Sequence, residues 1–413
     1  MRILLATYWP VPHVGGVWNY MEQLKEQLEI LGHEVDLLGY SEDNKSYVHI
    51  VNENRKAERD KLVTLINREL NESSSPTSYD DEVVSYCELQ RRIYELGVKQ
   101  LGLEKYDVIH TQDVFSTTCL NNIRPKGSVL VATLHGCVAH EIRYQINAHT
   151  LQSCTPYLVR SYFDVLEYTG AISAEYTIVA NQWLKNILTI EFRVPIEQIE
   201  VCHYGYDVEN FLKQAQETCS IERPNDKKVI IYTGRLTEIK GVHHLISALS
   251  HLKVIRDDWV CWIVGDGEKK AELKNQSKVL GLENHIFFLG KRDDVPCLIS
   301  NSDIFVLPSL IENQPLSVIE AQIAGKPMIV SYTGGLPEMV ENGVTGLISP
   351  VGNIEVLCNN LNLLLENEEY RKLLGFNAQK WGIAHWTLNK GVEKVLKIYT
   401  SAILKKRKKE TEE

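Results

Sequence analysis

Two basic residues in the second half of the chain have the chemistry and spacing of an anion site. Arg235 follows an apolar run at 229–233 and a glycine, and Lys240 comes five residues later. A planar guanidinium fork and a compact ammonium at one strand end match a diphosphate. Either cation alone would be an ordinary surface charge, but the pair behind a glycine-terminated strand favours a bound ligand.

Two carboxylates follow in the segment 308–321, which reads PSLIENQPLSVIEA. We expect Glu312 in a loop and Glu320 on a helix that begins near Pro315. An ionised carboxylate only accepts hydrogen bonds, and it can take two from a vicinal diol. With the cations, the pair indicates one set of sugar-like hydroxyls at each end of a diphosphate. Solvated charges on a helix face are the alternative, but helix-start chemistry gives no reason for Glu312.

Glycines beside expected strand ends would let a ligand approach the backbone. Gly15 and Gly16 lie between a strand and a helix, where N–H groups at a positive helix end suit a phosphate. Gly234 precedes Arg235, and Gly265 stands in a V-G-D-G loop that is small enough for a nucleotide to lie against. Ordinary turns explain each glycine taken alone, and they explain part of a glycine-dense run at 334–346. The G-x-G-x-x-G fingerprint of dinucleotide enzymes is absent from the first turn.

Two histidines belong to the same expected layer of the first half. His135 ends a strand and is followed by glycine, so it could face a ligand as a donor to a developing anion. A buried histidine with satisfied hydrogen bonds explains it equally well. His110 also ends a strand, and we rank it lower, as support for its neighbours.

The elements that must position these residues follow a strand–helix alternation along nearly the whole chain. Many of the strands are continuous Val/Ile/Leu runs, which is typical of parallel strands buried on both faces. Amphipathic stretches such as 17–31 separate them. The pattern predicts an α/β protein with two Rossmann-like doubly wound halves. The expected strands are 3–8, 34–38, 108–111, 129–134, 177–180, 200–203, 229–233, 260–264, 286–289, 304–307, 328–331 and 346–348.

A polar stretch at 205–228 indicates the break between the halves. Within the first half, a loop at 71–81 is rich in Ser, Asn and Asp, and we interpret it as a surface excursion rather than an acceptor surface. A basic run at 405–409 predicts a frayed, solvated helix end. The expected parts are a first domain at 1–205 with an insertion at 41–106, a second domain at 206–385, and a helix with a charged tail at 386–413.

Composition excludes several classes of protein. The 413 residues carry a net charge of -10, which disfavours nucleic acid as a partner. The first apolar stretch stops at Pro10, too early for a signal peptide, and no apolar run is long enough to span a bilayer. Nine cysteines at irregular spacing indicate free thiols in a reducing compartment, so we expect a cytoplasmic protein with at most peripheral membrane contact.

The motifs occur in an order that resembles a known family. They are Gly15-Gly16, Thr133–Gly136, Gly234-Arg235-Leu236 with Lys240-Gly241, Glu312 with Glu320, and Gly334–Glu338. Together they resemble the retaining GT-B glycosyltransferases of family 4, over residues 1 to about 390. The resemblance implies two Rossmann-like domains that face a cleft, with a C-terminal helix returning to the first domain. It also implies transfer of a hexosyl group from a nucleotide sugar to an acceptor hydroxyl, with the anomeric configuration retained.

The resemblance further implies a role for each matching residue. Arg235 and Lys240 would hold the donor diphosphate, while Glu312 and His135 would lie by the transferred sugar, and these four form the expected catalytic set. Glu320 would take the ribose hydroxyls. The other expected donor contacts are Gly15, Gly16, Gly234, Gly265, Leu316 and Ser317. No metal and no cofactor are expected, because cations and helix dipoles would stabilise the leaving diphosphate.

Two departures from the family pattern bear on the donor sugar. Asn313-Gln314-Pro315 stands where many members have Gly-Phe-Gly, and Tyr204-Gly205 stands where Asn-Gly is usual. Attack from the front face, with the leaving phosphate taking the acceptor's proton, is the mechanism that the family implies, and Glu312 as a covalent nucleophile is the alternative. The acceptor could be a sugar, a lipid-linked sugar or a small molecule. Three alternative hypotheses remain: a GT-B epimerase, a Rossmann oxidoreductase and an inactive sugar-nucleotide-binding subunit.

Overall fold

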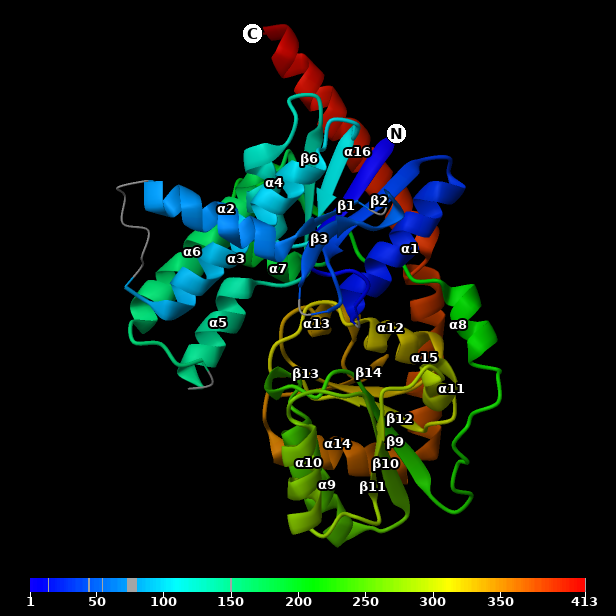
Figure 1. The fold of residues 1–413 in the computed structure, drawn as a ribbon. Helices are drawn as coiled ribbons and strands as arrows, with labels where there is room; N and C mark the ends of the chain where they lie inside the picture. Colours follow the sequence, from blue (N-terminus) through cyan, green and yellow to red (C-terminus); the bar gives the residue numbers. More distant parts are fainter. Residues whose placement is uncertain (14, 44, 54, 73–79, 149–150, 413) are drawn as a thin grey trace. The chain divides into compact units, whose positions relative to one another are not determined.

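The computed structural model describes the chain except for residues 14, 44, 54, 73–79, 149–150 and 413 (Figure 1). The chain divides into two compact units. The first consists of Met1–His203 together with Gly391–Glu413, and the second is Tyr204–Lys390. No helix within the described residues is long and apolar enough to cross a membrane.

The first unit is built on an eight-stranded sheet with the order β4-β3-β2-β1-β5-β6-β7-β8. Six strands are parallel, and only β3 and β4 run antiparallel to their neighbours. The parallel strands are the continuous apolar runs of the sequence, and their side chains form the core. The strands are β1 (Arg2–Pro10), β2 (Glu34–Tyr40), β3 (Tyr47–Ile50), β4 (Arg55–Glu58), β5 (Val108–Thr111), β6 (Val129–Leu134), β7 (Tyr176–Val179) and β8 (Ile199–Val201).

Helices cover both faces of this sheet, as the strand–helix alternation predicts. They are α1 (Gly16–Ile30), α2 (Arg59–Glu72), α3 (Glu82–Leu101), α4 (Val114–Ile123), α5 (Val138–Asn147), α6 (Pro156–Ser173), α7 (Gln182–Asn186) and α16 (Leu388–Glu412). Short helical turns are η1 (Val51–Glu53), η2 (Ile187–Glu191) and η3 (Ile196–Gln198).

The segment at 41–106, expected as an insertion, is an integral part of the first unit. It supplies the edge strands β3 and β4 and the helix α3, whose residues Ile93, Tyr94 and Val98 are fully buried. Asp81 caps α3 by accepting a hydrogen bond from the Val83 N–H at 2.9 Å. Most of the loop expected at 71–81 lies outside the described residues.

The second unit has a six-stranded parallel sheet with the order β11-β10-β9-β12-β13-β14. The strands are β9 (Lys228–Thr233), β10 (Trp259–Val264), β11 (Ile286–Gly290), β12 (Ile304–Leu307), β13 (Met328–Ser331) and β14 (Gly346–Ser349). The helices are α8 (Val208–Gln214), η4 (Glu238–Lys240), α9 (Val242–Ile255), α10 (Lys270–Val279), α11 (Val295–Ser300), α12 (Leu316–Ile323), α13 (Leu336–Met339), α14 (Ile354–Glu366) and α15 (Glu368–His385). All twelve strands predicted from the sequence are confirmed.

The last helix, α16, packs on the first unit, and the expectation of a frayed, solvated helix end is wrong for the first two residues of its basic run. Lys406 donates a hydrogen bond to the Ser128 carbonyl at 2.6 Å, and the Lys405 ammonium lies 5.0 Å from the centre of the Tyr176 ring. Lys405 and Lys406 thus have specific partners, while Arg407 and Lys408 are exposed, and the helix continues to Glu412.

His110 also fastens α16, since its Nδ1 lies 2.7 Å from the Tyr399 hydroxyl and its Nε2 lies 2.7 Å from Thr133 Oγ1. Burial lowers the pKa of His110 to about 3, and the charge of His135 lowers it further in the same direction. Below about pH 6.5, His110 therefore binds a proton in the unfolded chain but stays neutral in the folded chain.

We expect His110 alone to lower the free energy of unfolding by about 2 kcal/mol between pH 7.5 and pH 5. Urea titrations across this range measure the slope, and the His110→Gln variant should show a shallower one. Equal slopes in the two proteins would contradict the assignment.

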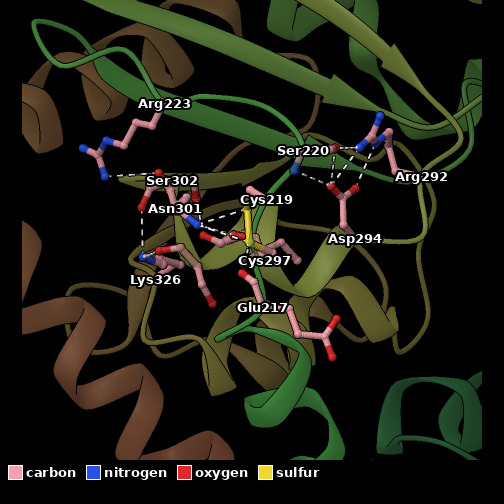
Figure 2. Close-up of a disulfide and its surroundings, with 12 residues drawn as sticks. Glu217, Cys219, Ser220, Arg223, Arg292, Asp294, Cys297, Asn301, Ser302 and Lys326 are labelled. Atoms are coloured by element: carbon pink, nitrogen blue, oxygen red, sulfur yellow. Dashed lines mark hydrogen bonds and ion pairs between the residues drawn. A yellow bond between two sulfur atoms is a disulfide. The ribbon is translucent and has the colours of Figure 1, made fainter.

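The expectation that all nine cysteines are free is wrong for one pair. Cys219, in the segment after α8, forms a disulfide with Cys297 on α11 (Figure 2). Beside it, the Asp294 carboxylate accepts a hydrogen bond from Ser220 Oγ at 2.8 Å. The segment after α8 is therefore held both by the disulfide and by this hydrogen bond. The remaining seven cysteines, all within the described residues, are free.

Reduction of this disulfide should lower the free energy of unfolding by about 2–4 kcal/mol, because it releases a cross-link between residues 78 positions apart. Urea unfolding with and without a thiol reductant measures the change. The Cys219→Ser/Cys297→Ser double variant is the control, since it should not respond to the reductant. An unchanged midpoint in the wild-type protein would refute a structural role for the bond.

Candidate active site

Four loops of the second unit meet at the carboxyl edge of its sheet. They follow β9, β10, β12 and β13, and two glycines let them touch. A Cβ on Gly265, at φ +137°, would lie 1.9 Å from the Gly234 carbonyl oxygen, and a Cβ on Gly334, at φ +57°, would lie 1.7 Å from the Glu312 carbonyl oxygen. Only glycine permits these backbone contacts, so the loops form one surface at the edge where ligands of parallel sheets bind.

Lys240 and Glu312 form an ion pair in this surface. Lys240 ends the turn η4, and its Nζ lies 2.6 Å from Glu312 Oε2, with side chains only 14% and 9% exposed. Ser309 Oγ donates a second hydrogen bond to the same oxygen at 3.0 Å. The sequence placed these two charges in one site, and the structure joins them directly.

Arg235 projects from the loop after β9, and its side chain is exposed. Its carbonyl oxygen accepts a hydrogen bond from the Tyr232 hydroxyl at 2.7 Å, which holds the loop against the end of the strand. Burial raises the pKa of Tyr232, the Glu312 carboxylate adds to the rise, and the Arg235 guanidinium opposes it. The Arg235 and Glu312 charges therefore both act on the Tyr232 phenol at the end of β9.

Glu320 lies on α12, as expected, and its carboxylate has a partner that the sequence did not suggest. The Tyr206 hydroxyl donates to Glu320 Oε1 at 2.8 Å. Burial raises the pKa of Glu320, and the bond from Tyr206 opposes the rise. Leu316 and Ser317 open α12, so their N–H groups belong to the helix turn that has no acceptor within the helix.

Residues of the first unit contribute a second group of candidates. Gly15 is the N-cap of α1 and Gly16 is its first residue, as the expected strand-to-helix turn requires. His135 follows β6, where its Nε2 donates to Gln112 Oε1 at 3.0 Å and its ring meets Tyr20 edge-on, with centroids 5.2 Å apart. Burial lowers the pKa of His135 to about 3, so the imidazole is neutral at pH 7.

Tyr206, Tyr232 and Ser309 are the site residues that sequence reasoning missed. Tyr206 is 114 positions from Glu320, and Tyr232 belongs to the buried run of β9. Nothing in local spacing marks either residue as polar support for a site. Within the part of the chain that the structure describes, no group of three or more His, Cys, Asp or Glu side chains is arranged to hold a metal ion.

Comparison with protein families agrees with this geometry. The model of Glycosyltransferase Family 4 matches residues 14–210, and the model of the glycosyl transferases group 1 matches residues 214–381. The chain belongs to the family 4 type of GT-B glycosyltransferases. This family 4 protein is accordingly a glycosyltransferase that uses a nucleotide sugar.

Curated relatives of this glycosyltransferase align over most of its length. A glycosyltransferase of Methanocaldococcus jannaschii is 25% identical over 391 residues, which cover 92% of this chain and 93% of the relative. The UDP-Gal:alpha-D-GlcNAc-diphosphoundecaprenol alpha-1,3-galactosyltransferase of Escherichia coli is 28% identical over 317 residues, which cover 75% of this chain and 79% of the relative.

Solved structures show that the fold is GT-B. Sucrose-phosphate synthase of Thermosynechococcus elongatus superposes with a TM-score of 0.74 at 20% identity, covering 97% of this chain and 98% of that one. HepE of Anabaena, in complex with UDP, superposes with a TM-score of 0.66 at 20% identity, covering 97% of this chain and 100% of that one.

Proposed function

We propose that this glycosyltransferase is retaining and metal-independent, and that it moves a hexosyl group from a UDP-sugar to an acceptor hydroxyl. The Lys240–Glu312 pair beside Arg235 carries the proposal, because it sets two cations and a fixed carboxylate in one backbone-lined surface. We propose uridine as the nucleoside of the donor, since HepE binds UDP and the Escherichia coli relative takes UDP-Gal. We place the reaction in the synthesis of a cell-surface glycan, a glycolipid or a small-molecule glycoside. The cytoplasm stays the proposed compartment on the ground of the seven free cysteines, and the Cys219–Cys297 disulfide argues against it.

The chemical problem is departure of a nucleoside diphosphate from an anomeric carbon. Negative charge grows on the phosphate oxygen as the bond lengthens, so a preorganised cation gains more from the departing than from the bound diphosphate. Lys240 and Arg235 supply that charge in our proposal, without a metal ion. The first-turn N–H groups of α12, from Leu316 and Ser317, add a positive helix end.

Glu312 orients the transferred sugar rather than attacking it. Its Oε2 already accepts hydrogen bonds from Lys240 and Ser309, at 2.6 and 3.0 Å. Both donors stabilise the carboxylate and reduce its nucleophilicity. This arrangement supports attack of the acceptor on the front face, where the leaving phosphate accepts the acceptor's proton.

Glu320 is the proposed ligand of the ribose hydroxyls, and Tyr206 keeps its carboxylate in position. Gly234 and Gly265 bring backbone close to the nucleotide in this proposal. The donor roles of Gly15, Gly16 and His135 remain predictions from the family resemblance. His135 enters this scheme as a neutral imidazole, because its pKa lies near 3; since its Nε2–H is donated to Gln112, its Nδ1 is an acceptor.

A thermal-shift panel of nucleoside diphosphates and nucleotide sugars tests the donor, with and without EDTA. A ligand at 100 times its Kd should stabilise the protein by about 2.7 kcal/mol. NMR of the product then reports the anomeric configuration. Stabilisation by UDP with EDTA present, together with a retained product, would support the proposal. An inverted product, or binding that EDTA abolishes, would reject it, and turnover without an acceptor would favour the epimerase.

A further inference from the structure

An aromatic cage in the first unit encloses a lysine of the same chain. Lys45 lies in the loop between β2 and β3, and its ammonium stands 4.7 Å from the ring centre of Tyr8, 4.9 Å from that of Tyr40 and 5.5 Å from that of Trp9. Its backbone is left-handed, with φ 62°, a conformation that costs a non-glycine residue about 1–2 kcal/mol. The loop accepts this strain while holding the ammonium over the rings.

A second cation, Arg59, is held against the loop of Lys45, because its backbone N–H donates to the Ser46 carbonyl oxygen at 2.8 Å. Burial lowers the pKa of Lys45, and the Arg59 charge lowers it further. Arg59 also opposes the rise that burial gives to the pKa of Tyr40, so its guanidinium is near that hydroxyl. Among the residues that the structure describes, neither cation has a carboxylate within 4.0 Å. The two positive charges therefore repel each other, and neither forms an ion pair with a carboxylate of the described residues, so a bound anion would stabilise both.

Asp113 is a buried carboxylate that acts on Lys45 but forms no ion pair with it. Asp113 attracts Lys45 from a distance, but its Oδ2 accepts hydrogen bonds from Thr7 Oγ1 at 2.9 Å and from the Tyr8 N–H at 2.8 Å. Its Oδ1 caps α4 through the Ser116 N–H at 2.7 Å. Asp113 is thus committed to holding the floor of the cage, and Tyr8 is fixed by it.

The cage lies where an open α/β sheet takes its ligands. Strand order passes from β2 through β1 to β5, so the chain switches direction beside β1, and Tyr8 and Trp9 stand at the carboxyl end of that strand. Gly15 and Gly16 follow on the next loop of the same edge. Trp9 is 42% exposed, and its ring offers a flat apolar face on which a sugar can stack.

We propose that Lys45, Arg59 and Trp9 form an acceptor subsite for a sugar that carries an anionic group, a carboxylate or a phosphate. The anion takes charge-assisted hydrogen bonds from the two cations, and the sugar ring lies on Trp9. The ammonium rests on the ring faces when no acceptor is bound. This inference rests on the proposed function, since it assigns the acceptor to the first unit.

Binding of three probes to the full chain, in the presence of saturating UDP, tests the subsite. Glucose 6-phosphate and methyl glucuronide separate phosphate from carboxylate, and methyl glucoside is the neutral reference. Isothermal titration calorimetry at low salt measures the Kd of each probe. We expect at least one anionic probe to bind about tenfold more tightly than methyl glucoside, because one charge-assisted hydrogen bond contributes about that factor. Lys45→Gln and Arg59→Gln should each abolish this preference, whereas Trp9→Leu should weaken all three probes.

Lys126→Gln is the matched control, because Lys126 is exposed and lies before β6, at the opposite edge of the sheet. It should keep the preference. Equal affinity for charged and neutral probes, or an unchanged preference in Lys45→Gln, would overturn the subsite. UDP binding is measured separately. If UDP binds but the probes show no preference, the acceptor subsite is rejected and the donor site is kept. If UDP does not bind, the donor site is rejected instead.

Discussion

Replacing Lys240 with alanine is expected to lower kcat about 10²–10³-fold, the usual cost of removing one preorganised partner of a developing oxyanion. Lys240 would supply its charge to the departing diphosphate, and its backbone position is fixed by the turn η4. Steady-state transfer with the donor found in the panel measures the effect. The variant also leaves the Glu312 carboxylate, with a side chain 9% exposed, without its ion pair.

Two further variants separate charge from folding. Arg235→Ala removes an exposed cation that forms no ion pair with the residues the structure describes, so it should lower kcat by a similar factor with little change in the free energy of unfolding. Lys278→Ala, on the exposed end of α10, is the control and should behave as wild type. Full activity in both Lys240→Ala and Arg235→Ala would exclude the assigned role of these cations.

Gly334→Ala should disable donor binding through the backbone alone. Its Cβ would lie 1.7 Å from the Glu312 carbonyl oxygen, so the loop that carries Glu312 must move away from the site. We expect at least a tenfold weaker Kd for UDP and a loss of unfolding free energy beyond the about 1–2 kcal/mol of a left-handed alanine. Calorimetry and urea unfolding measure the two effects.

Gly343→Ala is the matched control for this substitution. Gly343 also has a positive φ, of 79°, but the nearest atom to its Cβ would be the Tyr370 hydroxyl at 3.7 Å. It should show the conformational cost without the loss of UDP binding. If both variants bind UDP as the wild type does, close packing of these loops does not shape the donor site.

The parallel core was predictable because its strands are continuous apolar runs, which only a sheet covered on both faces can bury. The strands β3 and β4 were missed, since each has four residues and β4 reads R-K-A-E, a charged sequence suited to an exposed edge. The disulfide could not be deduced from spacing, because folding brings Cys219 to Cys297 across 78 positions.

The candidate site was predictable in its residue types and only partly in its contacts. Strand ends located Arg235, Lys240, Glu312 and Glu320, since loops after parallel strands share one edge. The direct bond between Lys240 and Glu312, and the bond from Tyr206 to Glu320, depend on loop conformations that glycines at 265 and 334 permit. Side-chain pairing of this kind is set by tertiary packing, and no local pattern encodes it.

A crystal structure of the chain grown with UDP tests the donor site most directly. We predict a diphosphate within hydrogen-bond distance of Lys240 Nζ and the Arg235 guanidinium, with the ribose hydroxyls on the Glu320 carboxylate. A nucleotide bound away from these three side chains would contradict the account.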